Sequence, residues 1–162
     1  MSEIIYDFGS GRSDPGTFPK EALQKAAVAA IEKEAVALTN YPGNLGHPGL
    51  RAAMARRESE REGVHVDPEH IVITNGSMQA VTLTAEALQE AHGDPIILEE
   101  FSYPGTLSAY RSLKFEMHGI PLSEQGMRLD VLEARLEELD KAGRRPKFIY
   151  TITTYQNPTG FV

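Results

Sequence analysis

Residues 71–88 read IVITNGSMQAVTLTAEAL and carry the clearest structural pattern in the chain. A short β-branched run ends at Thr74, the pair Asn75-Gly76 breaks it, and apolar side chains then recur at helical spacing from Met78 to Leu88. This segment is therefore predicted to form a strand, a tight turn and a helix.

The same unit is repeated in the residues that follow. Further strands are predicted at 96–98, from 115 and at 148–153, with helices after Pro104 and Gly126. Strands that alternate with amphipathic helices favour parallel pairing, so the predicted fold class is α/β, with a mainly parallel sheet flanked by helices. The last strand runs into Asn-Pro-Thr-Gly near the chain end, where a further helix and strand would be needed to cover the sheet. We therefore expect a truncated domain that is poorly stable by itself.

The N-terminal side of this pattern is predicted to be helical. One helix is expected after Pro19, and a loop rich in Gly and Pro follows over 39–49. A second, charged helix is predicted from Leu50 to Glu62 and ends at Gly63.

The composition excludes several classes of site and partner. The 162 residues include no cysteine, which rules out disulfides and thiolate metal sites, and no other metal site is predicted. The net charge is -7 and no basic run exceeds the pair Arg144-Arg145, which argues against nucleic-acid binding. No apolar run reaches the roughly 18 residues of a membrane span, and no secretory leader begins the chain, so no membrane contact is expected and the cytoplasm is the predicted location.

Three loops should meet at one edge of the sheet, because ligands of parallel α/β sheets bind at the carboxyl ends of the strands. The first holds Gly76-Ser77 before a helix whose unpaired N–H groups would attract a phosphate; a turn with a helix cap is the alternative. In the second, the Tyr103 ring would either stack on a planar ligand or only pack. In the third, the Asn157 amide would donate to an oxyanion, or the segment would be only a turn.

Together, the three loops resemble those of class I/II aminotransferases of fold type I, which use pyridoxal 5′-phosphate. The Tyr-Pro-Gly loop and the Gln-Asn-Pro-Thr-Gly ending are most similar to the branch that contains 2-aminoadipate aminotransferases and the aminotransferase-like domains of MocR regulators. The resemblance runs through the segments Phe8 to Gly11, Asp14-Pro15, Phe18-Pro19, Tyr41-Pro42, Gly46, Leu50-Arg51, Ile73 to Ala80, Glu99 to Gly105, Gly126 to Leu129 and Tyr150 to Gly160.

This resemblance implies a domain plan and a phosphate site. Residues 1–40 would form an N-terminal arm and first helix, and residues 41–162 the N-terminal half of the cofactor-binding large domain. Ser77 and the backbone N–H of Met78 would donate hydrogen bonds to the cofactor phosphate. Gln79 would either touch the phosphate or cap the helix.

Other residues are implied to contact the cofactor ring, the substrate or a second subunit. Tyr103 would stack on the pyridine ring, and Asn157 would bind its phenolic oxygen and lie near the substrate carboxylate. Tyr41 would reach the phosphate of a neighbouring subunit, which implies a homodimer. Ser10 and Gly11 would line the substrate pocket.

The family also needs groups that the chain lacks. These are a Schiff-base lysine, an aspartate at the pyridinium nitrogen and arginines for the phosphate and the substrate carboxylate, all expected beyond Val162. The lysines present lie outside the three loops: Lys20, Lys25, Lys33, Lys114, Lys141 and Lys147. No catalytic residue is assigned, and this chain alone is expected to be inactive.

The resemblance leaves several functions open. The complete protein would transfer an amino group between an amino acid and a 2-oxo acid. The alternatives are a pyridoxal-phosphate-sensing domain of a MocR-type regulator, although no helix-turn-helix precedes the aminotransferase opening, and an inactive fragment. A nicotinamide-binding domain is disfavoured, because Gly76 to Gln79 lacks the G-x-G-x-x-G spacing. The amino-acid donor is not identified.

Overall fold

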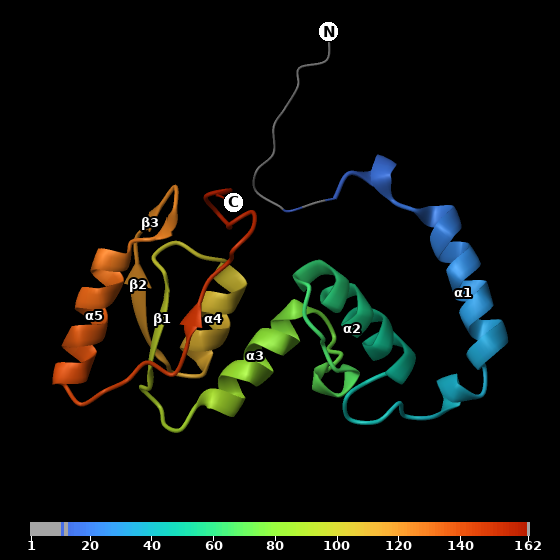
Figure 1. The fold of residues 1–162 in the computed structure, drawn as a ribbon, viewed down its shortest axis with the longest axis horizontal. Coiled ribbons are helices and arrows are strands. Elements are labelled where there is room, and N and C mark those ends of the chain that lie inside the picture. Colours follow the sequence, from blue (N-terminus) through green and yellow to red (C-terminus); the bar gives the residue numbers. More distant parts are fainter. Residues whose placement is uncertain (1–10, 12, 162) are drawn as a thin grey trace, which may run out of the picture. The chain divides into compact units, whose positions relative to one another are not determined.

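The computed structural model describes residue 11 and residues 13–161, which divide into two compact units (Figure 1). The first unit extends to Ile73, and its described residues form only helices and loops. The second unit begins at Thr74 and contains the strands.

In the described part of the first unit, the elements are the α-helices α1 (Lys20–Glu34) and α2 (Pro48–Glu62) and the short 3-10 helices η1 (Pro15–Thr17), η2 (Ala37–Thr39) and η3 (Pro68–His70). Helix α2 confirms the predicted charged helix, and it ends at Gly63, whose φ of 68° is left-handed. At its start, His47 Nδ1 accepts the Leu50 N–H at 3.1 Å. The buried Arg51 donates to Pro68 O at 2.9 Å, which ties α2 to η3.

The second unit confirms the predicted α/β class. Its elements are α3 (Ser77–Leu88), β1 (Pro95–Glu99), α4 (Pro104–Ser112), β2 (Glu116–Ile120), β3 (Leu122–Ser123), β4 (Gly126–Met127), α5 (Leu129–Lys141) and β5 (Ile149–Tyr150). Strands β2, β1 and β5 form a parallel sheet in that order, and β3 and β4 form a small antiparallel hairpin.

Helices cover both faces of the parallel sheet. On one face, Ile96 and Leu98 of β1 pack with Ala85 of α3 and Tyr110 of α4. Alternation along the strand turns the fully buried Ile97 to the opposite face, where α5 lies against β2 (Figure 1). The predicted crossovers therefore produce a three-layer arrangement within this unit.

Two predicted strands differ in the structure. Residues 71–74 form no strand, because the part of the chain that the structure describes offers no neighbouring strand to pair with. Their backbone donates from Ile71 N–H to Pro68 O at 3.2 Å and from Ile73 N–H to Leu45 O at 2.9 Å. The strand predicted at 148–153 is shorter in the structure and covers only Ile149–Tyr150. It ends early because the Ile152 N–H donates to the side chain of Glu99 at 2.8 Å and so leaves the ladder.

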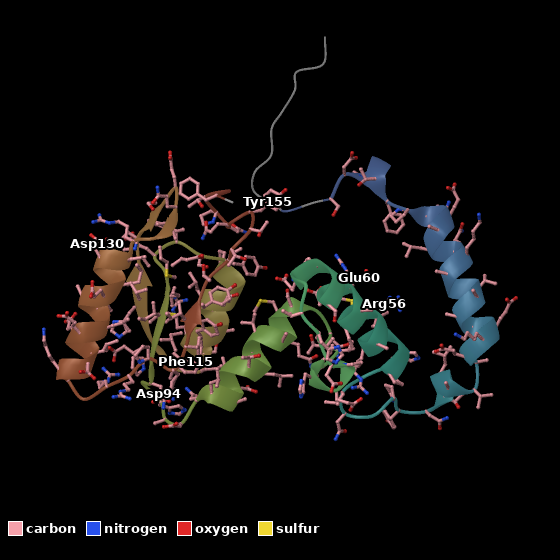
Figure 2. All side chains as sticks on the ribbon, in the orientation of Figure 1. Arg56, Glu60, Asp94, Phe115, Asp130 and Tyr155 are labelled. Atoms are coloured by element: carbon pink, nitrogen blue, oxygen red, sulfur yellow. The ribbon has the colours of Figure 1, made fainter. Side chains whose placement is uncertain are left out.

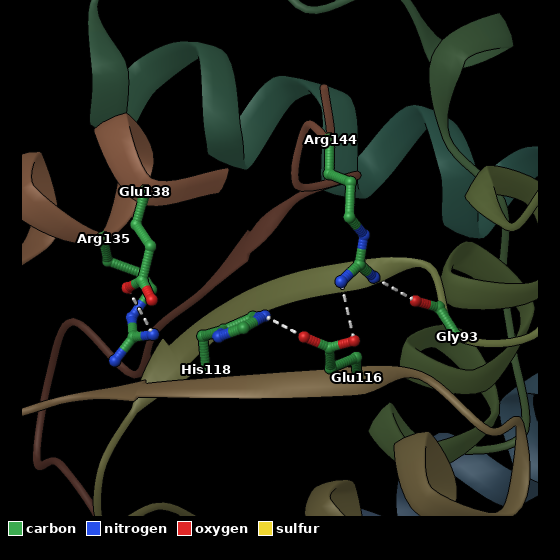
Figure 3. A network of polar contacts seen from close by, with 6 residues as sticks. All are labelled: Gly93, Glu116, His118, Arg135, Glu138 and Arg144. Atoms are coloured by element: carbon green, nitrogen blue, oxygen red, sulfur yellow. Dashed lines mark hydrogen bonds and ion pairs between the residues drawn. The ribbon is translucent and has the colours of Figure 1, made fainter. Parts of the chain in front are cut away.

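The amino ends of the strands carry an ion-pair network that is separate from the three loops. Arg144 donates to Glu116 Oε2 at 2.9 Å and to Gly93 O at 2.7 Å, and His118 Nε2 lies 2.9 Å from Glu116 Oε1 (Figure 3). The bond from Arg144 holds the pKa of Glu116 below its ordinary value. Figure 2 shows Asp94 at this edge and Tyr155 at the opposite edge, where the loops after β1 and β5 lie.

Candidate functional site

The loop before α3 forms a sharp turn whose backbone donors are unpaired. Gly76 has a φ of 84° and no side chain caps the helix, so the N–H groups of Ser77, Met78 and Gln79 form an open first turn. Among residue 11 and residues 13–161, no acceptor is in hydrogen-bond contact with these three groups. Thr74 Oγ1 donates to Gly76 O at 3.0 Å and stabilises the turn. The geometry is that of an anion-binding helix terminus.

Gln79 stabilises this turn from the helix side. Its Oε1 accepts the N–H of Asn75 at 2.7 Å, across the turn, in the manner of a reciprocal cap. The sequence leaves two roles open for Gln79, a contact to the phosphate or a cap of the helix. In the structure, its side-chain carbonyl oxygen acts as a cap. The amide nitrogen is left to donate elsewhere.

The loop after β1 presents a tyrosine at the start of α4. Tyr103 is the N-cap residue, Pro104 occupies the first helical turn as predicted, and 41% of Tyr103 is exposed. The ring lies against Gly105, where an added Cβ would come within 2.5 Å of Tyr103 Cε1. Glycine at position 105 therefore permits this ring orientation.

Gly105→Ala is expected to displace the Tyr103 ring while changing the free energy of unfolding by less than about 1 kcal/mol, since only the far end of a side chain must move. The ring proton signals of Tyr103 in NMR spectra measure the displacement. Ser108→Ala, at an exposed position of the same helix, is the control. Unchanged Tyr103 signals in the Gly105 variant would contradict the expectation.

Thr106 connects the first two loops. Its side chain is 1% exposed, its Oγ1 is 3.1 Å from Tyr150 Oη, and the same oxygen lies 4.0 Å from Met78 Sδ. Helices α3 and α4 pack along each other at this point. The turn at 74–79 and the Tyr103 loop thus lie at the same edge of the sheet.

A buried carboxylate connects the second and third loops. Glu99, at the carboxyl end of β1, is 1% exposed. Its Oε1 accepts Thr151 Oγ1 at 2.7 Å and Ile152 N–H at 2.8 Å, and its Oε2 accepts Ser102 Oγ at 3.0 Å and Gln156 Nε2 at 2.8 Å. Burial raises the pKa of Glu99, but these four hydrogen bonds outweigh burial and leave the pKa below its ordinary value.

The third loop is organised around Gln156, which is 3% exposed. Its amide nitrogen also donates to Phe101 O at 2.7 Å, and its Oε1 accepts the N–H and Oγ1 of Thr159 at 2.9 and 2.6 Å. Asn157 follows directly, joined to Pro158 by a cis peptide bond, and its side chain is exposed. The loop therefore presents the Asn157 amide from a backbone that Gln156 holds on both sides.

The structure brings together only part of the predicted site. Ser77, Met78, Gln79, Tyr103 and Asn157 all belong to the second unit. The first three form the first turn of α3, Tyr103 follows β1 and Asn157 follows β5.

The other predicted contacts lie elsewhere. Tyr41 belongs to the first unit and is fully exposed, and Gly11 is exposed as well. Ser10 lies outside the described residues.

Sequence reasoning did not single out Glu99, Gln156 and Thr106. The available signal for Glu99 was an acidic residue at the end of a wholly buried apolar strand, where an ionised group needs several donors. The loop from Thr151 to Phe161 borders a cavity of about 310 Å³, whose lining includes Glu99, Glu124, Gly126, Thr153, Gln156 and Phe161.

No lysine of the second unit is near these loops. Lys114 precedes β2, Lys147 precedes β5, and Lys141 is the last residue of α5, so all three lie toward the amino ends of the strands. Lys147 is paired there with Glu90, at 2.6 Å.

The described residues offer neither a membrane span nor a cluster of metal ligands. They contain no helix that is long and apolar enough to cross a membrane. Within the same part of the chain, no three His, Asp or Glu side chains gather in a way that would hold a metal ion.

Comparison with protein families gives a match over residues 4–162 to the model described as aminotransferase class I and II. The chain belongs to this family. It is 35% identical to aromatic-amino-acid aminotransferase 1 of Thermococcus litoralis, over 98% of this chain and 38% of that protein.

Two solved aminotransferase structures share the fold. An archaeal alanine:glyoxylate aminotransferase has a TM-score of 0.83 at 37% identity, over 92% of this chain and 36% of that one. The α-aminoadipate aminotransferase LysN of Thermus thermophilus, complexed with N-(5′-phosphopyridoxyl)-L-leucine, has a TM-score of 0.80 at 34% identity, over 96% of this chain and 37% of that one. The chain thus spans little more than a third of the length of these proteins.

A regulator is also among the relatives. The chain is 32% identical to the HTH-type transcriptional regulator YdcR of Escherichia coli, over 97% of this chain and 32% of that protein. Family membership therefore includes relatives described as enzymes and relatives described as regulators.

Proposed function

We propose that the protein to which this chain belongs is a pyridoxal 5′-phosphate-dependent aminotransferase that transfers an amino group between an amino acid and a 2-oxo acid. The observation that carries the proposal is the gathering of an unpaired helix terminus, an exposed tyrosine and an exposed asparagine at one sheet edge in a member of this family.

The described residues fit a phosphorylated aromatic cofactor. The first turn of α3 offers unpaired N–H groups beside the Ser77 hydroxyl, and a Cβ at Gly76 would meet nothing within 4 Å, so no side chain fills the space beside this glycine. Tyr103 offers an accessible ring, and Asn157 offers an amide that donates hydrogen bonds.

Each residue has a distinct role in this proposal. Ser77 and the Met78 N–H bind the phosphate, while Gln79 holds the turn in shape. Tyr103 stacks on the pyridine ring and excludes water from that face. Asn157 donates to the phenolic oxygen, stabilises its anionic form and lies near the substrate carboxylate. When bound, the cofactor supplies the electron-withdrawing ring that amino transfer needs.

The remaining assignments concern the assembly and the substrate. We infer a homodimer in which the exposed Tyr41 reaches the phosphate site of the second subunit, with Ser10 and Gly11 in the substrate pocket. The domain plan of residues 1–40 as arm and first helix and residues 41–162 as part of the large domain belongs to the same proposal. We place the protein in the cytoplasm and in amino-acid metabolism.

Titration with pyridoxine 5′-phosphate, which has no aldehyde, tests the site by itself. The expected result is a saturable change in the NMR amide signals of residues 76–79, with changes at Tyr103 and Asn157. Changes confined to α5, or none at millimolar ligand, would refute the proposed site. Transfer of an amino group to 2-oxoglutarate, measured on the protein at the full length that its gene encodes, tests the activity.

No lysine of this chain is expected to react stoichiometrically with pyridoxal 5′-phosphate. Lys114, Lys141 and Lys147 lie at the amino ends of the strands, and Lys147 is held in an ion pair. Borohydride reduction followed by peptide mass spectrometry should show low, dispersed labelling. One lysine that reaches a single adduct per chain would overturn this expectation.

The similarity to YdcR favours a second candidate function, a domain that binds pyridoxal 5′-phosphate in a MocR-type transcriptional regulator. Both functions use the same cofactor contacts. A full-length protein that binds the cofactor and a specific DNA site without amino-transfer turnover would support the regulator.

A further inference from the structure

Glu99 is a buried acidic side chain that no cation of the described residues, 11 and 13–161, neutralises. Its two carboxylate oxygens accept four hydrogen bonds, and the donors are two hydroxyl groups, one amide side chain and one backbone N–H. No Lys, Arg or His side chain of the described residues forms a salt bridge with it. The carboxylate is therefore held ionised by positioned dipoles, which makes its acceptor pattern strict.

The four donors come from both loops that present the proposed ring contacts. Ser102 immediately precedes Tyr103, and Gln156 immediately precedes Asn157. Gln156 Nε2 also donates to Phe101 O, so a second bond joins the two loops directly. Glu99 therefore accepts hydrogen bonds from Ser102, the residue before Tyr103, and from Gln156, the residue before Asn157.

From this arrangement we propose that Glu99 is a positioning residue that fixes the spacing between Tyr103 and Asn157, so that both contact the same aromatic ligand. The inference rests on the proposed function for the identity of that ligand. Glu99 does not touch the ligand; it acts through the backbone of the two loops, as a supporting residue does for a ligand-binding group.

The amide isostere isolates this role from size and shape. In Glu99→Gln, one side-chain oxygen becomes an NH₂ group that cannot accept hydrogen bonds. The NH₂ group then faces either Thr151 and Ile152 or Ser102 and Gln156, so one pair of donors loses its acceptor whichever way the amide turns. Glu100→Gln makes the same chemical change at the next position, where the side chain is exposed, and is the matched control.

Two measurements on the full 162-residue chain test the proposal. Amide hydrogen exchange read by mass spectrometry reports loop order, and Glu99→Gln is expected to exchange about tenfold faster in peptides covering 100–106 and 151–161, but not in α5. Binding of pyridoxine 5′-phosphate is expected to weaken about tenfold, whereas binding of inorganic phosphate, which needs only the 76–79 turn, stays unchanged. A purely structural role would weaken both ligands together.

Each outcome has a defined meaning. If the Glu99 and Glu100 variants match the wild type in exchange and in both affinities, the positioning role is wrong. If the wild type binds neither ligand, the proposed function fails, and the exchange data alone decide whether Glu99 joins the loops. If Glu99→Gln does not fold, Ser102→Ala and Thr151→Val each remove one donor, and smaller changes in the same two peptides are expected; unchanged exchange in both would overturn the proposal.

Discussion

Replacing Tyr110 by alanine is expected to destabilise the second unit by about 3–5 kcal/mol, the range for loss of a large aromatic side chain from a core. Tyr110 is 3% exposed, and its ring meets those of Phe115, Phe148 and Tyr150 edge-on, at centroid distances of 6.0, 5.4 and 5.6 Å. The same ring lines an apolar cleft of about 290 Å³ between α3 and β5, so the deleted volume would enlarge an existing opening.

Urea unfolding followed by near-UV circular dichroism measures this loss. A destabilisation of this size approaches the whole stability of a small domain, so the near-UV signal of the variant should already be largely lost before urea is added. Tyr110→Phe keeps the ring and is expected to cost less than about 1.5 kcal/mol; burial raises the pKa of Tyr110 to about 12, so only a neutral hydroxyl is removed. Tyr155→Ala, at a side chain that is 77% exposed, is the second control. A Tyr110→Ala variant that unfolds like the wild type would show that this cluster does not hold the unit together.

Much of this core could be predicted from the sequence, because local patterns determine it. The apolar run around Ile96 to Leu98 is buried on both faces as a central parallel strand must be, and Pro104 begins α4 at the expected turn. Residues 71–74 differ from this, because a local pattern does not determine their structure. Their β-branched pattern favours extended backbone, but a strand also needs a partner strand, and none pairs with these residues in the part of the chain that the structure describes.

The candidate site also contains some residues that local sequence patterns predict and others that they do not. The turn at Gly76 and the position of Tyr103 follow from local chemistry, so the sequence predicted which residues reach the edge of the sheet. The Glu99 to Gln156 hydrogen bond joins residues 57 positions apart, and no local pattern encodes it. The bond depends on the pairing of β5 with β1, which brings Thr151 and Gln156 to the Glu99 carboxylate. Residues that contact a ligand follow recognisable motifs, whereas the residues that hold them are found through the packing.

Acidification is expected to destabilise the second unit as the pH falls below about 4.5, the ordinary pKa of a glutamate. The pKa of Glu99 in the folded protein is lower than this value. Burial raises the pKa, but the hydrogen bonds, chiefly those from Thr151 and Gln156, lower it by more than burial raises it. A carboxyl of this kind contributes its full stabilisation above the unfolded pKa and loses it as the pH falls through the folded pKa. Once protonated, Glu99 carries an O–H group that faces hydrogen-bond donors, because both of its oxygens already accept hydrogen bonds. A donor that faces another donor is unfavourable.

Other carboxyl groups add to this acid sensitivity, so a variant is needed to isolate Glu99. The pKa of Glu116 is lowered chiefly by Arg144, and that of Asp94 by the backbone N–H groups of Ala91 and Glu90, and both lie at the opposite edge of the sheet. The urea midpoint measured from pH 7 to pH 3 should therefore fall in every variant.

Glu99→Gln should begin from a lower midpoint and fall less steeply, because the group that must be protonated is gone. Glu124→Gln, which changes another acidic side chain lining the same cavity, should follow the wild-type curve. Parallel curves for the wild type and Glu99→Gln would mean that folding leaves the pKa of Glu99 unchanged, and a wild-type curve less steep than that of Glu99→Gln would mean that folding raises this pKa and keeps the group protonated. The hydrogen bonds to its two oxygens would then hold an acid rather than a carboxylate, and the strict acceptor pattern on which its positioning role depends would be lost.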